Sequence, residues 1–297
     1  MPSAPGAAAA SAGSAGRQFA GLSLDQVRLM GIVNVTPDSF SDGGETAATA
    51  AAVARGLAML AEGADIIDVG GESTRPGALP VLLETELARV VPVVRALAEA
   101  GAVVSVDTRH AAVMRAAIAA GARIVNDITA LQGDAEALAV VASAAVSVVL
   151  MHMQGEPRTM QRDPRYDDAA TDVHRWLAGR AAACIAAGVP AERIAVDPGI
   201  GFGKTLAHNL QVIAGLARYR DLPYAVLLGV SRKSFIAAVD RSVPPKQRLG
   251  GSLAAALAGV RAGVHILRVH DVADTRQALA VQRALAEVDE ASPRTLA

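Results

Sequence analysis

Two basic side chains near the C-terminus, Arg268 and His270, lie two positions apart. On an extended strand, residues at this spacing point to the same side, so both can face one ligand. Together with Arg75 they supply the N–H donors that bind phosphate and diphosphate groups. Taken singly, Arg75 is equally well explained as a loop charge and His270 as a hydrogen-bonded rim histidine. Because the whole chain carries a formal net charge of only −1, a local anion site explains the three together.

A second set of polar side chains, Asp107, Asn126, Asp197 and Lys233, has the chemistry to bind a nitrogen-rich ring. The carboxylates and the amide can accept hydrogen bonds from adjacent N–H donors on the ring edge, and Lys233 can donate to a ring carbonyl or nitrogen. Each charge-assisted bond of this kind contributes about 1.5–3 kcal/mol when water is excluded. The alternative is an internal Asp–Lys ion pair that only holds the fold closed.

Aromatic residues are scarce, and three of the 4 phenylalanines, Phe40, Phe202 and Phe235, lie in the loop segments that carry these polar groups. Phenylalanine on such a loop can flank a bound aromatic ring, although Phe235 is equally suited to helix packing. The glycine-rich segment 199–205 lacks the spacing of a phosphate-binding loop. No Ser, Cys or His is arranged as a nucleophile, which argues against covalent catalysis.

The polar residues follow short apolar runs that alternate with longer Ala- and Leu-rich stretches. The runs are nearly continuous and rich in β-branched residues, which is typical of parallel strands buried on both faces. They are Leu29–Val35, Ile66–Val69, Val103–Val106, Ile124–Val125, Val146–Met151, Ile194–Val196, Ala225–Val230 and His265–Val269. Helix-like stretches such as Thr46–Ala61, Leu83–Glu99 and Asp167–Ala187 separate them. The alternation predicts a single-domain α/β fold, a (β/α)8 barrel over residues 28–288, with an open doubly wound sheet as the alternative.

All eight runs end at polar or charged residues. In a barrel these ends meet at the C-terminal mouth, where the active sites of this fold lie. Helix capping explains one or two of them, such as Asp127 and Asp271, but not eight in succession. We therefore expect a functional site at the mouth. The residues are Asn34, Glu72 to Arg75, Asp107 to Arg109, Asn126 and Asp127, His152, Asp197, Ser231 to Lys233, and Arg268 to Asp271.

Composition limits the classes of partner. The near-neutral charge excludes a globally basic nucleic-acid binder, and no charge-free apolar run of about 18 residues predicts a membrane span. A single cysteine, Cys184, fits a reducing cytoplasm. Residues 1–20, rich in Ala, Gly, Ser and Pro, are predicted to be a disordered tail, with an organellar transit peptide as the alternative. Residues 289–297 are predicted to be a short C-terminal tail.

The segments at the strand ends resemble the bacterial dihydropteroate synthases. They are MGIVNVTPDSFSDGG (30–44), DVGGESTRPGA (68–78), VSVDTR (104–109), IVNDI (124–128), LMHMQGEPRTMQ (150–161), VDPGIGFGKT (196–205), GVSRKSF (229–235) and RVHDV (268–272). The resemblance implies a (β/α)8 barrel of the TIM type. It also implies a transferase that joins 4-aminobenzoate to 6-hydroxymethyl-7,8-dihydropterin diphosphate, releasing diphosphate and forming 7,8-dihydropteroate in folate biosynthesis. In this family sulfonamides compete for the aminobenzoate pocket.

The resemblance also implies a role for each matching residue. Asn34 matches the ligand of Mg2+, the implied cofactor. Asp107, Asn126, Met151, Asp197 and Lys233 match the pterin contacts, and Asn34, Arg75, Arg268 and His270 match the diphosphate contacts. Phe40, Thr74, Pro76, Phe202 and Ser231 match the surroundings of the aminobenzoate. The family further implies a homodimer with small-molecule substrates and neither nucleic acid nor membrane as partners.

These roles favour an SN1-like alkyl transfer in which the protein positions the reactants and compensates charge. The expected catalytic residues are Asp107, Asp197, Lys233, Arg268 and His270. The sequence leaves two alternatives. One is the methyltetrahydrofolate-binding domain of corrinoid-dependent methyltransferases, and the other is a catalytically silent paralogue that binds pterins.

Overall fold

The computed structural model describes residues 16–36, 44–73 and 77–291, with only the backbone described at 44–46 and 289–291. Eight parallel strands close into a barrel in the order β10-β3-β4-β5-β6-β7-β8-β9. The strands are β3 (Arg28–Asn34), β4 (Ile66–Gly70), β5 (Val104–Asp107), β6 (Ile124–Asp127), β7 (Ser147–Met151), β8 (Ile194–Asp197), β9 (Ala225–Leu228) and β10 (Ile266–Val269). The predicted closed barrel is therefore confirmed, and the open-sheet alternative is wrong.

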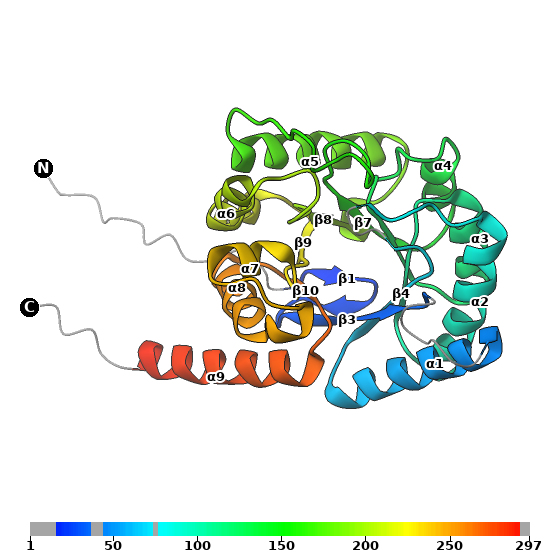
Figure 1. Cartoon of the computed structure of the whole chain (residues 1–297), viewed down its shortest axis with the longest axis horizontal. Coiled ribbons are helices and arrows are strands. Elements are labelled where there is room, and N and C mark those ends of the chain that lie inside the picture. The colour runs from blue at the N-terminus through cyan, green and yellow to red at the C-terminus, as the bar shows by residue number, and fades with distance from the viewer. Residues whose placement is uncertain (1–15, 37–43, 74–76, 292–297) are drawn as a thin grey trace, which may run out of the picture.

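Helices surround the barrel (Figure 1). They are α1 (Gly44–Glu62), α2 (Leu83–Glu99), α3 (Ala111–Ala119), α4 (Ala137–Ser143), α5 (Ala169–Ala186), α6 (Leu206–Ala214), α7 (Ser234–Val239), α8 (Leu249–Ala262) and α9 (Val272–Ala291). Short 3-10 turns lie at η2 (Ala191–Arg193), η3 (Leu216–Asp221) and η4 (Pro245–Gln247). No helix in the described part of the chain is long and apolar enough to cross a bilayer.

Alternation along each strand divides the core into two layers. Outward side chains such as Ile67, Val69 and Val106 pack against the helices. Inward side chains such as Met30, Ile66 and Val149 fill the lower barrel. Because successive residues of a strand point to opposite faces, the same inward register continues up to the polar residues at the mouth.

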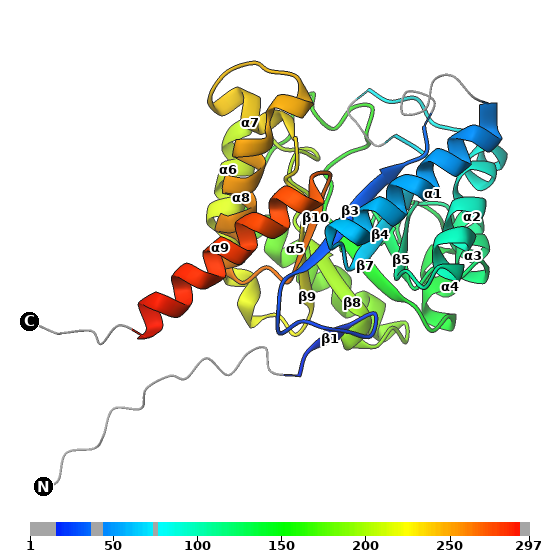
Figure 2. The same cartoon turned by 90° about the horizontal axis from the view of Figure 1, so that it is seen from below.

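A short N-terminal hairpin closes the bottom of the barrel, opposite the loops that follow the strands (Figure 2). It consists of β1 (Gln18–Phe19) and β2 (Leu22–Ser23), paired antiparallel. Phe19 is 1% exposed and packs with Met30 and Ile66 in the barrel interior. The expectation that the disordered tail extends to residue 20 is therefore wrong for residues 16–20. Their apolar anchor belongs to the folded core, whereas residues 1–15 lie outside the described residues.

The C-terminal boundary also differs slightly from the prediction. Helix α9 continues to Ala291, past the predicted end of the barrel at residue 288. Residues 292–297 lie outside the described part of the chain. The predicted tail at 289–297 thus begins within the last turn of a helix.

Candidate active site

Four adjacent strands place one row of inward residues at the mouth. The register pairs Asn34 with Gly70, Gly70 with Asp107, and Asp107 with Asn126. On the other side of the barrel, Met151 is paired with Asp197 at the ends of β7 and β8. Sequence-predicted residues from five strands therefore lie at the mouth of one barrel, with Asn126 in register with Val149, one inward position before Met151.

Arg268 of β10 reaches across the barrel to two carboxylates. Its Nε lies 2.6 Å from Asp68 Oδ2, and its Nη2 lies 2.7 Å from Asp107 Oδ2. Burial alone would lower the pKa of the guanidinium, but the two carboxylates raise it above its ordinary value. The planar guanidinium thus stays charged and is held in one orientation by two partners.

Asp107 is 9% exposed and faces a mixture of charges. Burial raises the pKa of its carboxyl to about 7, the Arg268 cation opposes this rise, and the Asp68 carboxylate adds to it. Near neutral pH, Asp107 is therefore balanced between the charged and the protonated form. A group in this state responds strongly to whatever charge a ligand brings.

Asp68 is a site residue that the sequence analysis missed. It is fully buried, and its Oδ2 also accepts a 3.1 Å hydrogen bond from Asn126 Nδ2. Its strand, IIDVG, reads as one apolar run, which concealed the carboxylate. Counting inward positions back by two from Gly70 would have found it.

Asp197 and Lys233 lie on the opposite side of the barrel from β5. Burial raises the pKa of Asp197, although the Lys233 charge and the Gly199 N–H, 2.8 Å from Oδ1, act against the rise. Burial lowers the pKa of Lys233 to about 8. Within the described chain no ion pair joins the two, since Lys233 Nζ donates to the Ile200 carbonyl and lies 4.8 Å from the centre of the Phe202 ring. A closed Asp–Lys pair, the structural alternative, is therefore not formed.

The loop between β8 and α6 is held by a buried lysine that the sequence analysis did not single out. Lys204 Nζ lies 2.9 Å from His152 Nδ1 and donates to the carbonyls of Gly199 and Phe202 at 2.9 and 3.1 Å. Burial lowers the pKa of Lys204 to about 7 and that of His152 to about 3. Neutral His152 can thus accept a hydrogen bond through Nδ1 from the Lys204 ammonium.

Glycine is required at a contact of this loop with β7. Gly199 has a φ of +65°, and a Cβ there would lie 1.9 Å from the His152 carbonyl oxygen. Only glycine combines this left-handed conformation with such a close approach. The loop that carries Ile200 and Phe202 is therefore fixed by both backbone and side chain.

Ser231 and His270 lie together at the rim. His270 Nδ1 is 3.0 Å from Ser231 Oγ, and the His270 backbone N–H donates to the same oxygen at 3.2 Å. The predicted residues Phe40, Thr74, Arg75 and Pro76 lie outside the described residues. Phe235 is 8% exposed and packs in the core behind the strands, as a structural residue would.

A cluster of metal-binding donor types does not include Asn34. Ligand atoms of Glu72, Glu86 and His110 lie within 4.8 Å of one another. Glu86 accepts a 2.6 Å hydrogen bond from Thr108 Oγ1 and lies 2.7 Å from His110 Nδ1, while Glu72 pairs with Arg109 at 3.1 Å. These side chains already form hydrogen bonds and ion pairs with their neighbours. The cluster is therefore explained as a hydrogen-bond network that fixes the loop after β5.

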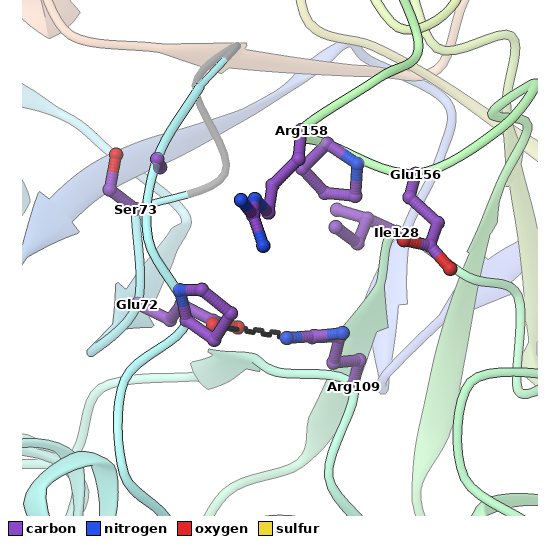
Figure 3. Close-up of a pocket in the computed structure, with 9 residues that line it drawn as sticks. Glu72, Ser73, Arg109, Ile128, Glu156 and Arg158 are labelled. Atoms are coloured by element: carbon purple, nitrogen blue, oxygen red, sulfur yellow. Dashed lines mark hydrogen bonds and ion pairs between the residues drawn. The ribbon is translucent and has the colours of Figure 1, made fainter.

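A pocket lies beside this network, between the loops that follow β4 and β7. Figure 3 shows Arg158 pointing into it, opposite the Glu72–Arg109 pair. Its lining residues are Glu72, Ser73, Ala78, Pro80, Arg109, Ile128, Glu156, Pro157 and Arg158. Glu72, Ser73 and Arg109 are residues expected at the mouth, whereas the inward residues Asp107, Asn126 and Asp197 do not line this pocket.

Comparisons with known proteins give consistent results. Residues 30–270 match the family model described as pterin binding enzyme. The dihydropteroate synthase of Escherichia coli strain K12 is 46% identical over 274 residues, which are 92% of this chain and 96% of that relative.

Solved structures agree with the sequence comparison. The dihydropteroate synthase of Xanthomonas albilineans with 4-aminobenzoic acid superposes with a TM-score of 0.84 and 50% identity, covering 90% of this chain and 96% of that one. The same organism's enzyme in complex with 7,8-dihydropteroate gives a TM-score of 0.81 and 47% identity, covering 92% and 97%. At these identities the resemblance extends well beyond the fold.

Proposed function

Since the chain belongs to the dihydropteroate synthases, the pterin-binding transferases that make 7,8-dihydropteroate in folate biosynthesis, we propose that its barrel mouth is the site of that reaction. The observation that carries the proposal is that Asp107, Asn126, Met151 and Asp197 are all buried, inward-facing residues at the C-terminal ends of the adjacent strands β5 to β8. The proposed substrates are 6-hydroxymethyl-7,8-dihydropterin diphosphate and 4-aminobenzoate. The Xanthomonas relatives are solved with 4-aminobenzoic acid and with 7,8-dihydropteroate, which supports both.

The pterin ring is proposed to lie in the barrel mouth. Asp107, Asn126 and Asp197 would bind its N–H edge, and Lys233 would donate to its carbonyl or ring nitrogen. Met151, which is 4% exposed, would pack on the ring face. Burial strengthens each of these bonds because water competes poorly there.

The diphosphate is proposed to lie above the ring, toward Arg268, His270 and Asn34, with Arg75 as the further donor. Nε and Nη2 of Arg268 already face carboxylates, so a phosphate oxygen would meet Nη1. The aminobenzoate is proposed to lie against Phe202 and near Ser231. Phe40, Thr74 and Pro76 complete that proposed slot.

The donors around Gly70 fit Mg2+. Asn34 Oδ1 and Asp107 Oδ2 lie 3.7 and 3.6 Å from the position that a Cβ on Gly70 would occupy. Oxygen donors beside a glycine suit a small hard cation that keeps waters and phosphate oxygens as its other ligands. We propose that Asn34 is its protein ligand. When bound, Mg2+ would neutralise charge on the diphosphate.

The residues fit an SN1-like transfer. The bond between the pterin methylene and the diphosphate oxygen breaks, and its electron pair leaves with the diphosphate, whose charge Arg268 and His270 offset. The carboxylates of Asp107 and Asp197 stabilise the resulting cation, which is conjugated with the ring. The aminobenzoate amine then forms the new C–N bond and releases its proton.

A homodimer in the cytoplasm is proposed on two observations. Val281, Leu285 and Val288 of α9 are 56%, 67% and 67% exposed and lie on one helix face, which suits burial against a second copy. Cys184 is a free, buried thiol, which fits a reducing compartment.

The proposed function is tested by measuring diphosphate release from the purified protein with dihydropterin diphosphate. Release that requires both 4-aminobenzoate and Mg2+, and that a sulfonamide blocks, supports the proposal. Pterin binding without turnover would instead identify a silent paralogue. Absence of pterin binding would remove the site assignment altogether.

A further inference from the structure

Asp68 lies in the barrel one inward position below the mouth. Its register partners are Ile32 on β3 and Ser105 on β5, whereas the row above contains Asn34, Gly70 and Asp107. Its exposed fraction is 0%. Because none of its side chain is exposed, the Asp68 carboxylate is closed off from a ligand at the mouth.

Both donors to Asp68 come from residues proposed to bind dihydropterin diphosphate, Asn126 at the pterin ring and Arg268 at the diphosphate. Its Oδ2 accepts from Arg268 Nε at 2.6 Å and from Asn126 Nδ2 at 3.1 Å. Its Oδ1 has no hydrogen-bond partner in the described structure. Among the described residues, both polar contacts of this buried carboxylate are thus with residues proposed to bind substrate.

These hydrogen bonds determine the orientation of the Asn126 amide and the Arg268 guanidinium. Because Asn126 directs Nδ2 toward Asp68, its Oδ1 is turned away from Asp68 and remains available as an acceptor. Arg268 is fixed at two points, by Asp68 at Nε and by Asp107 at Nη2. Without Asp68 the amide can flip, and the guanidinium keeps a single anchor.

A neighbouring acid shows what a purely structural carboxylate looks like. Asp127 is also 0% exposed, but its oxygens accept from the backbone N–H groups of Thr129 and Leu131 and from the Thr129 hydroxyl. Those bonds fix a turn outside the barrel. Asp68 makes no such backbone bond in the described part of the chain.

We propose that Asp68 is a positioning residue for dihydropterin diphosphate, acting through Asn126 and Arg268 without touching substrate. The inference rests on the proposed role of the barrel mouth. It predicts a selective loss of binding of dihydropterin diphosphate, because the proposed roles of Asn126 and Arg268 are at the pterin and the diphosphate and not at the aminobenzoate.

The first test compares Asp68→Ala with Asp68→Asn in steady-state kinetics. Asp68→Ala is expected to raise the KM for dihydropterin diphosphate about tenfold or more, the effect of one lost charge-assisted bond, and to leave the KM for 4-aminobenzoate within about twofold. Asp68→Asn keeps an oxygen that can accept from both partners, so its pterin KM is expected to lie between those of wild type and Asp68→Ala. Equal changes in the two KM values, or unchanged kinetics in both variants, would overturn the proposal.

The second test uses coupling. In an Asn126→Ala background, Asp68→Ala is expected to raise the pterin KM by a clearly smaller factor than in wild type. The reason is that Asn126, one of the two residues that Asp68 positions, has already been removed. Full multiplicativity of the two factors contradicts action through Asn126. If Asn126→Ala alone leaves the pterin KM unchanged, the proposed pterin site itself fails and this inference fails with it.

Asp127→Asn serves as the matched control, because Asp127 is equally buried on the next strand but one. Its melting temperature is expected to fall without any divergence of the two KM values. Should Asp68→Ala not fold, calorimetric binding of dihydropterin diphosphate to Asp68→Asn decides the matter. Weaker binding than wild type supports the proposal, and unchanged binding overturns it.

Discussion

At the scale of single residues, Asp197 has the most direct predicted effect. It is 5% exposed, and replacing it with alanine removes a charge-assisted bond to the pterin edge. We expect Asp197→Ala to lower kcat/KM for the pterin substrate about a hundredfold, equivalent to about 3 kcal/mol. Initial rates at varied pterin concentration measure this effect. Asp240→Ala, whose side chain is 79% exposed, is the control, and a loss below about fivefold would show that Asp197 is structural.

Some of the site residues could be predicted from the sequence and others could not. Predictable site residues follow apolar runs at strand ends, and this position identifies Asp107, Asn126 and Asp197 as candidates. Asp68 lies inside a run and Lys204 inside a glycine-rich loop, and their roles depend on partners far away in the chain, Arg268 and His152. Strand periodicity points to the inward face, but it does not identify which distant side chain lies across the barrel.

At the scale of elements, the loop between β8 and α6 is predicted to be rigid because Lys204 holds it. Lys204→Met retains the length of the side chain but removes the donors to Gly199 and Phe202. We expect faster hydrogen exchange over 199–205 and a KM for 4-aminobenzoate about tenfold higher, since the loop carries Phe202. Mass-resolved exchange and initial rates measure the two effects. Lys246→Met, at an exposed position, should change neither, and unchanged exchange in Lys204→Met would show that the backbone alone fixes the loop.

The N-terminal hairpin is an element that sequence reasoning assigned in part to a disordered tail. Strands of two residues show no periodicity, and their apolar anchor, Phe19, stands alone in a segment of small residues. We expect Phe19→Ala to lower the free energy of unfolding by about 3 kcal/mol, the usual result of deleting a buried phenyl ring. Its kinetic constants should not change, because the ring lies at the end opposite the mouth. Urea unfolding measures the loss, and a change below about 1 kcal/mol would mean that the hairpin only covers the barrel.

At the scale of the whole molecule, the barrel separates stability from chemistry along its axis. Apolar inward residues fill the lower part, and buried charges occupy the upper part. The alternation of apolar runs and helical stretches was sufficient to predict this architecture, because buried parallel strands need helices on their outer face. The pairing of charges inside the barrel was not predictable, since it follows from closure and register.

The buried charges also make the stability of the whole molecule depend on pH. The pKa of Asp107 is raised to about 7 from 3.8, so between these values the folded state holds a proton that the unfolded state has released. Stability from this group is therefore present at low pH and is lost as pH rises through about 7. Buried His152 and His265, with pKa values lowered to about 3 and about 4, act in the opposite direction, so the wild-type profile alone does not isolate Asp107. We therefore expect Asp107→Asn, which cannot ionise, to gain stability relative to wild type as pH rises from 5 to 7, with the difference levelling off above about 8. Urea unfolding of both proteins across this range measures the difference, and a constant difference would show that Arg268 keeps Asp107 ionised throughout.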